Sequence, residues 1–161
     1  MKYFFVAFFL VLFGGCSTPQ YTKSATKLLI LKTPKIRFSD IAYIRYSHDN
    51  AIELELYVAG SMVNRFSIHH LICVENKGCM RKTSFNKSYL SESYPDTLLE
   101  NILLGKPIYD GLHVKRNGDG FFQRIETKNV YILYKVTHHS ISFKDKYNHI
   151  LIKIKDIHNG K

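Results

Sequence analysis

The sequence has no apolar run long enough to cross a bilayer as a helix. Its longest run, Tyr3–Phe13, has 11 residues, which rise about 16 Å as a helix, whereas a crossing takes ~20 residues. There is also no P-loop, no dinucleotide-binding fingerprint and no G-x-S-x-G motif. The glycine-rich stretch 117–120 precedes a predicted strand and is expected to be a loop. We therefore expect a protein that is not an enzyme and that holds no cofactor.

A metal motif is also missing, although the chain has 8 histidines. His69–His70 and His138–His139 are adjacent pairs, and neighbours on a strand point to opposite faces of the sheet. Neither H-x-x-x-H nor H-E-x-x-H occurs. Because structural zinc needs four convergent ligands, we predict no metal site.

Acidic residues are scarce. The chain has 13 Asp and Glu against 23 Lys and Arg, which gives a formal net charge of +10. A length of 161 residues allows one domain, and a hydrophobic fraction of 45% excludes long disorder. So basic a chain would ordinarily suggest nucleic-acid binding, and the N-terminal residues decide whether that class applies.

The N-terminus has the pattern of an export signal. A basic start, the apolar run and the small pair Gly14–Gly15 precede Cys16. This order resembles the lipobox of bacterial lipoproteins, which implies that residues 1–15 are cleaved as a signal peptide and that Cys16 is acylated. The alternative is a plain secretory signal with a chance cysteine at its junction.

Export changes which anionic partners the positively charged chain can meet. Cleavage before Cys16 leaves 146 residues with a charge near +9, because Lys2 is the only charged residue removed. Ser17, where inner-membrane lipoproteins carry Asp, implies the outer membrane by the sorting rule of such lipoproteins. We expect a periplasm-facing, lipid-anchored monomer that meets phospholipid head groups and envelope proteins rather than nucleic acid.

Hydropathy indicates one antiparallel β-rich domain over residues 36–161, after a lipidated tether and lead-in over residues 16–35. The segment 27–35 is compatible with a strand or a helical turn. Residues 52–58 alternate strictly between apolar and other side chains, as in a half-buried strand. Residues 80–92 are polar with spaced aromatics and are predicted to be irregular.

One helix is predicted in the middle of the chain, opened by Pro95 and ended by Gly105. Its apolar stripe consists of Leu98, Leu99, Ile102 and Leu103. A helix this short is stable only when its stripe packs on something. The predicted fold class is therefore α+β, with a curved antiparallel sheet and a short central helix.

Cys73 and Cys79 flank a predicted turn, and export to an oxidising compartment favours a disulfide between them. The alternative is a redox-active pair, but five intervening residues are unlike a C-x-x-C arrangement. We expect the bond to pin a hairpin.

Charged side chains are expected on the outer face of the sheet. Glu53 and Glu55 are expected to share a solvated edge. Four lysines are predicted to form a basic patch on the final hairpin: Lys144, Lys146, Lys153 and Lys155. They are either a solvated face or a contact surface for an acidic partner or anionic head groups. Same-face lysines on paired strands repel each other, and that cost favours the contact surface.

The order of these features resembles the outer-membrane lipoprotein receptor LolB and the related periplasmic carrier LolA. The resemblance rests on the helix followed by Gly105 and Pro107, on residues 141–145, and on the closing strand 150–155. It implies a half-barrel whose concave apolar face, covered by helices, holds lipoprotein acyl chains. It also implies a membrane-insertion loop, for which Val58 and Met62 are the candidates. The implied partners are the outer membrane, a periplasmic lipoprotein carrier and lipoprotein acyl chains.

The expected acyl-chain cavity is lined from the alternating strands and the helix stripe. Its candidate residues are Leu54, Leu56, Phe66, Ile68, Leu98, Leu99, Ile102, Leu103, Ile132, Tyr134, Ile152 and Ile154. Alternation alone does not distinguish a ligand cavity from a filled core. A filled core would instead favour a small structural or interaction lipoprotein of an envelope or secretion complex.

Overall fold

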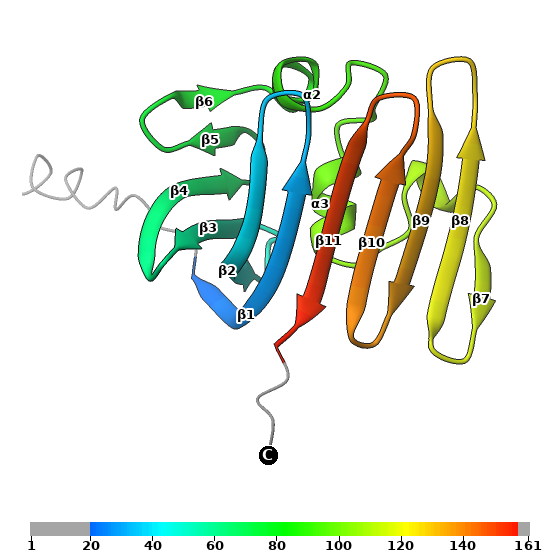
Figure 1. Cartoon of the computed structure of the whole chain (residues 1–161). Coiled ribbons are helices and arrows are strands. Elements are labelled where there is room, and N and C mark those ends of the chain that lie inside the picture. Colours follow the sequence, from blue (N-terminus) through cyan, green and yellow to red (C-terminus); the bar gives the residue numbers. More distant parts are fainter. Residues whose placement is uncertain (1–19, 158–161) are drawn as a thin grey trace, which may run out of the picture.

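Eleven strands form one open, curved antiparallel sheet in the computed structural model, which describes residues 20–157 (Figure 1). The strand order is β6-β5-β4-β3-β2-β1-β11-β10-β9-β8-β7. The strands are β1 (Tyr21–Lys32), β2 (Arg37–Ser47), β3 (Ile52–Val58), β4 (Ser61–Ile68), β5 (Ile72–Val74), β6 (Gly78–Met80), β7 (Lys115–Asn117), β8 (Gly120–Glu126), β9 (Tyr131–Thr137), β10 (Ser140–Asp145) and β11 (Ile150–Asp156). The predicted signal peptide and Cys16 lie outside the described residues.

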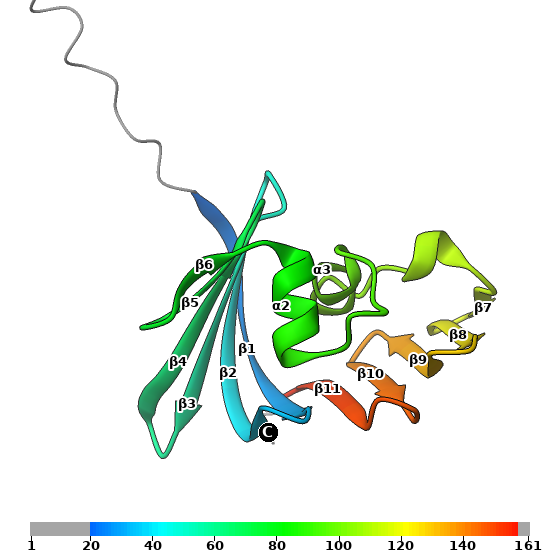
Figure 2. The ribbon, with the colours of Figure 1, turned by 90° about the horizontal axis from the view of Figure 1, so that it is seen from above.

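The two faces of the sheet differ because side chains alternate along each strand. In β11, Ile150, Ile152 and Ile154 are buried on the inner face, whereas Leu151 and Lys153 are only partly covered on the outer face. β8 follows the same rule, and β3 follows it except at Glu55, which is buried although it lies on the outer face. The sheet curves around two short helices, which lie against its inner face (Figure 2).

The helices are α2 (Lys82–Tyr89) and α3 (Leu98–Leu103). The four stripe residues predicted for the central helix are all buried in α3. Gly105 ends the helix in the left-handed conformation, with φ +64°. Its N–H donates to the Ile102 carbonyl (3.1 Å), and the Lys106 N–H donates to the Asn101 carbonyl (2.8 Å). These two bonds form a Schellman cap, so the predicted stop at Gly105 is confirmed.

Neither helix is a membrane-crossing segment: among the residues described, none combines the length and the apolar character that a span requires.

The central helix begins at Leu98 rather than at the predicted Pro95. Two other segments also differ from the sequence prediction. The sheet begins at Tyr21, inside the predicted tether and lead-in, because β1 pairs with β2 along its whole length. β11 pairs with β1 only from Lys27 onward, so the first residues of β1 are open to solvent on that side. These residues are polar, and the sequence therefore gives no apolar pattern for a strand there. Residues 82–89, predicted to be irregular, form α2, which buries only Phe85 and Asn86 and so has little apolar periodicity.

Two buried polar side chains hold the loops around α3 on the inner face of β8–β10. Gln123 is fully buried, and its amide donates to the Ile108 carbonyl (2.9 Å) and the Leu112 carbonyl (2.7 Å) while accepting from the Ile108 N–H (2.9 Å). Asp145 accepts from the Tyr94 hydroxyl at 2.8 Å. Burial, with the Asp145 carboxylate next to it, raises the pKa of Tyr94. Buried polar groups satisfied in this way hold one defined packing of the loops on the sheet.

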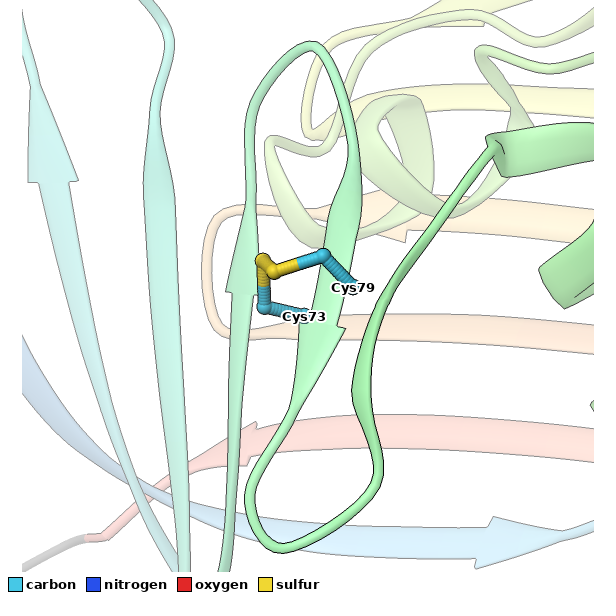
Figure 3. The surroundings of a disulfide bond; sticks show 2 residues. All are labelled: Cys73 and Cys79. Atoms are coloured by element: carbon cyan, nitrogen blue, oxygen red, sulfur yellow. A yellow bond between two sulfur atoms is a disulfide. The ribbon is translucent and has the colours of Figure 1, made fainter.

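The hairpin of β5 and β6 carries the disulfide (Figure 3). Cys73 and Cys79 are directly paired across the two strands and lie at bonding distance, with an S–S separation of 1.99 Å. The predicted pairing is therefore the one that the structure forms. The bond ties together two strands of only three residues each at one edge of the sheet.

Replacing both cysteines with serine (C73S/C79S) should lower the free energy of unfolding by about 2 kcal/mol, the value expected for closing so short a loop. Urea unfolding followed by circular dichroism measures the loss. A reductant should bring the natural chain to the level of the double variant and leave the variant itself unchanged. Equal stability of the oxidised natural chain and the variant would contradict a structural role for the bond.

Candidate functional site

The twelve residues predicted to line an acyl-chain cavity all belong to the hydrophobic core, and none is more than 8% exposed. Phe66, for example, packs edge-on against Phe85 of α2, with ring centroids 6.2 Å apart. Most of the predicted cavity is therefore filled by side chains of the helical layer. Two of the twelve, Leu103 and Ile154, also line a cleft at one end of this core.

The cleft has a volume of about 400 Å³. It lies where α3 ends over the inner face of β1 and β11, beside the turn between β9 and β10. Its lining residues are Lys23, Ala25, Lys27, Tyr46, Leu103, Leu104, Gly105, Val136, Thr137, His138, His139, Ser140, Ile141, Ile154 and Asp156. Clefts of this volume are typical of small-molecule sites.

The deep wall of the cleft is apolar. Leu103 and Leu104 come from the end of α3, Val136 and Ile141 from the hairpin of β9 and β10, and Ile154 from β11. The Tyr46 hydroxyl donates to the Leu103 carbonyl at 3.3 Å, which ties the end of α3 to β2. Burial raises the pKa of Tyr46, so this hydroxyl stays protonated and keeps donating.

Charged and polar side chains form the rim. Lys27 pairs with Asp156, and His139 Nδ1 lies 3.2 Å from the second carboxylate oxygen of Asp156. The hydrogen bond from Lys27 holds the pKa of Asp156 below its usual value, and the bond with His139 adds to the effect. The one carboxylate in the cleft is thus occupied by basic partners, while Lys23 is exposed at the rim. The rim therefore favours an anionic or neutral head group over a cationic one.

Gly105 shapes the wall where the chain leaves α3. A Cβ at this position would lie 3.5 Å from Ile141 Cδ1 and 3.5 Å from Val136 Cγ1. Gly105 ends α3 in a left-handed conformation, and the chain that follows stays on the sheet, where the Lys106 carbonyl accepts from the Tyr134 hydroxyl of β9 at 3.0 Å. The cleft opens beside this turn.

The cleft lies at the end of the sheet where the described chain begins. Lys23 and Ala25 in its wall follow Tyr21 closely in β1. Five residue steps separate Cys16 from Tyr21, and a fully extended chain covers at most about 18 Å in that interval. A lipid on Cys16 would therefore hold the cleft close to the bilayer.

The predicted membrane-insertion loop lies elsewhere. Val58 ends β3 and Met62 lies in β4, on either side of the hairpin turn, and the Val58 side chain is exposed. Tyr21 pairs with Ser47, next to the turn that leads into β3. The hairpin tip is therefore at the opposite end of β3 from the chain start, and the structure does not bring it to the cleft.

The predicted basic patch lies on the outer face, apart from the cleft. Lys144, Lys153 and Lys155 alternate with buried inner-face residues of β10 and β11. Lys146, in the turn between these strands, lies 4.5 Å above the ring of Tyr131. The patch is thus a surface feature and contributes nothing to the cleft.

One expectation about the outer face was wrong. Glu55 is not part of a solvated edge, because only 2% of the residue is exposed. It accepts from Arg65 Nε at 3.1 Å and from the Tyr57 hydroxyl at 2.9 Å. Arg45 pairs with Glu53 and also reaches Glu55 at 3.4 Å. The side chains of Arg45 and Arg65 contact these carboxylates and help to cover them, which the alternation of residue types alone does not reveal.

The cleft residues that the sequence reasoning missed come mainly from β1 and from the turn between β9 and β10. Lys23, Ala25 and Lys27 fall in the predicted tether and lead-in, where the apolar run that follows Lys27 is the only signal for a strand. Across residues 20–157, no three His, Cys, Asp or Glu side chains come together as a metal-binding group.

Comparison with known proteins adds no relative: no family model, no curated protein and no solved structure matches this chain.

The cap at Gly105 can be tested by substitution. Gly105→Ala should lower the free energy of unfolding by about 1 kcal/mol, the cost of a left-handed backbone for a residue with a Cβ. Gly118→Ala is the matched control, because nothing lies within 4 Å of a Cβ there and its φ is not in the left-handed region. Thermal unfolding measures both, and equal midpoints for the two variants would contradict the role given to Gly105.

Proposed function

We propose that this protein is a lipid-anchored, outer-membrane protein of the LolB type, which binds an acyl chain in the cleft and receives or inserts lipoproteins at the membrane. The observation that carries the proposal is the cleft itself. Its apolar wall, its basic rim and its place beside the start of β1 suit a ligand with an apolar chain and an anionic or neutral head. The lipobox-like sequence at Cys16 implies the lipid anchor that would hold the protein at the membrane.

The cleft supports acyl binding on energetic grounds. Each buried methylene contributes about 0.8 kcal/mol, so ten methylenes contribute about 8 kcal/mol before the costs of association. A wall of Leu, Ile and Val side chains is sufficient for such a ligand, because the attraction is not directional. The volume accommodates part of a lipoprotein's acyl groups, with the remainder at the open mouth.

The shape of the sheet is a second support. The sheet is open and curved and has two short helices on its inner face, an arrangement compatible with the half-barrel that the LolB resemblance implies. In this reading α3 is the lid: its last residues, Leu103 and Leu104, form one wall of the cleft. Tyr46 bonds the Leu103 carbonyl and so fixes the lid at its free end.

A second candidate function is that of a structural or interaction lipoprotein. The specific observation in its favour is that the predicted cavity residues are packed in the core, so that only the end of the layer is open. This candidate requires no ligand in the cleft. Ligand binding at the cleft therefore separates the two proposals.

Ala25→Phe should block the cleft, because Ala25 lines it and a phenyl ring would enter its volume. We expect the natural chain to bind a fluorescent sixteen-carbon fatty acid and the variant to bind it at least tenfold more weakly. Ser24→Phe is the matched control, because Ser24 is the next residue in β1, is exposed and does not line the cleft. Absence of binding by the natural chain, or equal loss in both variants, would sink the acyl-binding proposal and favour the interaction lipoprotein.

The transfer role is tested in cells by depletion. Loss of the protein should cause other lipoproteins to accumulate in the inner membrane or periplasm, as measured by membrane fractionation. The natural chain should reverse the accumulation, and Cys16→Ser should not, because it removes the proposed anchor. If depletion leaves lipoprotein distribution unchanged, the receptor role fails even if the cleft binds acyl chains.

A further inference from the structure

The outer face of the sheet carries a cationic surface larger than the four lysines of the final hairpin. We define the lysine face as Lys32, Arg37, Lys135, Lys144, Lys153 and Lys155. These residues come from β1, β2, β9, β10 and β11, which the sheet places side by side. Lys153 is partly buried and the other five are exposed.

The lysine face has almost no compensating negative charge. By alternation, the outer side of β1 and β8–β11 presents one carboxylate, Glu126, which pairs with Arg124 at 3.0 Å. None of the six cations takes part in an ion pair within the described part of the chain. In the register of β1 and β2, Lys32 lies directly opposite Arg37. Like charges in that position lower stability, so the arrangement is costly unless something covers it.

The register sets a regular spacing between the cations. Lys135 and Lys153 both pair with Ser142 of β10, and Lys144 and Lys32 both pair with Leu151 of β11. Each of these cation pairs is thus two interstrand spacings apart, or about 10 Å. The partly covered side chain of Leu151 lies between Lys144 and Lys32, whereas those of Leu133 and Ile30 lie next to Lys144 and Lys153 in the register. Charged side chains in protein interfaces belong to the polar rim that surrounds a more apolar centre.

Two observations direct the lysine face away from the anchoring membrane; both rest on the lipid anchor proposed for Cys16. Figure 2 shows the described chain starting on the far side of the helices from β8–β11, whose outer faces point the other way. Lys32 and Arg37 are also at the far end of β1 from Tyr21, about 36 Å along the strand. The anchor point, at most about 18 Å from Tyr21, is therefore closer to the start of β1 than to the end that carries Lys32 and Arg37.

We propose that the lysine face is a docking surface for the acidic surface of a partner protein. Carboxylates of the partner would pair with the six cations, and its apolar side chains would cover Ile30, Leu133 and Leu151. Complementary charge of this kind sets orientation and speeds association. A bilayer rich in anionic lipid is the other polyanion of the envelope, and the test separates the two.

The test uses the full chain with Cys16→Ser, so that no lipid confuses the result, and a fluorescent decaglutamate peptide as the acidic probe. Lys144→Glu/Lys153→Glu should weaken peptide binding at least tenfold, as measured by anisotropy. The matched control is Lys77→Glu/Lys87→Glu, which makes the same change in net charge at two exposed lysines near the other end of the sheet. The control should change binding less than twofold.

Three outcomes would overturn the proposal: no binding by the natural face, equal weakening in the control, or loss of binding to phosphatidylglycerol vesicles that depends on the lysine face. The last would assign the face to a membrane. Circular dichroism verifies folding, and Lys144→Gln/Lys153→Gln replaces the charge reversal if it unfolds the chain. Failure here is distinct from failure of the cleft proposal, because the lysine-face variants should bind the fluorescent fatty acid as the natural chain does.

Discussion

The pairing of β1 with both β2 and β11 is the constraint on which the rest of the structure depends. All other neighbours in the described sheet are consecutive strands, so each half of the chain forms a meander of hairpins. β1 joins the two meanders: it pairs with β2 along its whole length and with β11 from Lys27 to Lys32. The sheet that results contacts the helices from both halves: Phe66 of β4 packs on Phe85 of α2, and the Tyr134 hydroxyl of β9 donates to the Asn101 carbonyl of α3.

The same strand links the two surfaces to which functions are proposed. Its inner side supplies Lys23, Ala25 and Lys27 to the cleft, and its outer side supplies Lys32 to the lysine face. The two are separated by the thickness of the sheet and by the length of β1. The cleft can therefore lie near a bilayer while the lysine face remains free for a partner protein.

Much of the fold follows from local patterns. Strict alternation in residues 52–58 and 150–156 identifies β3 and β11, and the stripe ending at Gly105 identifies α3. The pairing of Cys73 with Cys79 follows from their spacing around a turn. α2 was missed because it buries only Phe85 and Asn86, and β1 because half of its length has solvent on one side. In both segments the burial that stabilises the element comes from distant residues.

The sequence by itself determined the class of fold, the disulfide and the export pattern around Cys16, because each depends on residues close together in the chain. Only the tertiary structure decided that the predicted cavity is a core, that a cleft remains where α3 ends, and that Lys32, Lys135 and Lys153 share one surface. Alternation reports that one face of a strand is buried. It carries no information about which strand lies next to it, and therefore none about the space or the charge that two neighbouring strands create together.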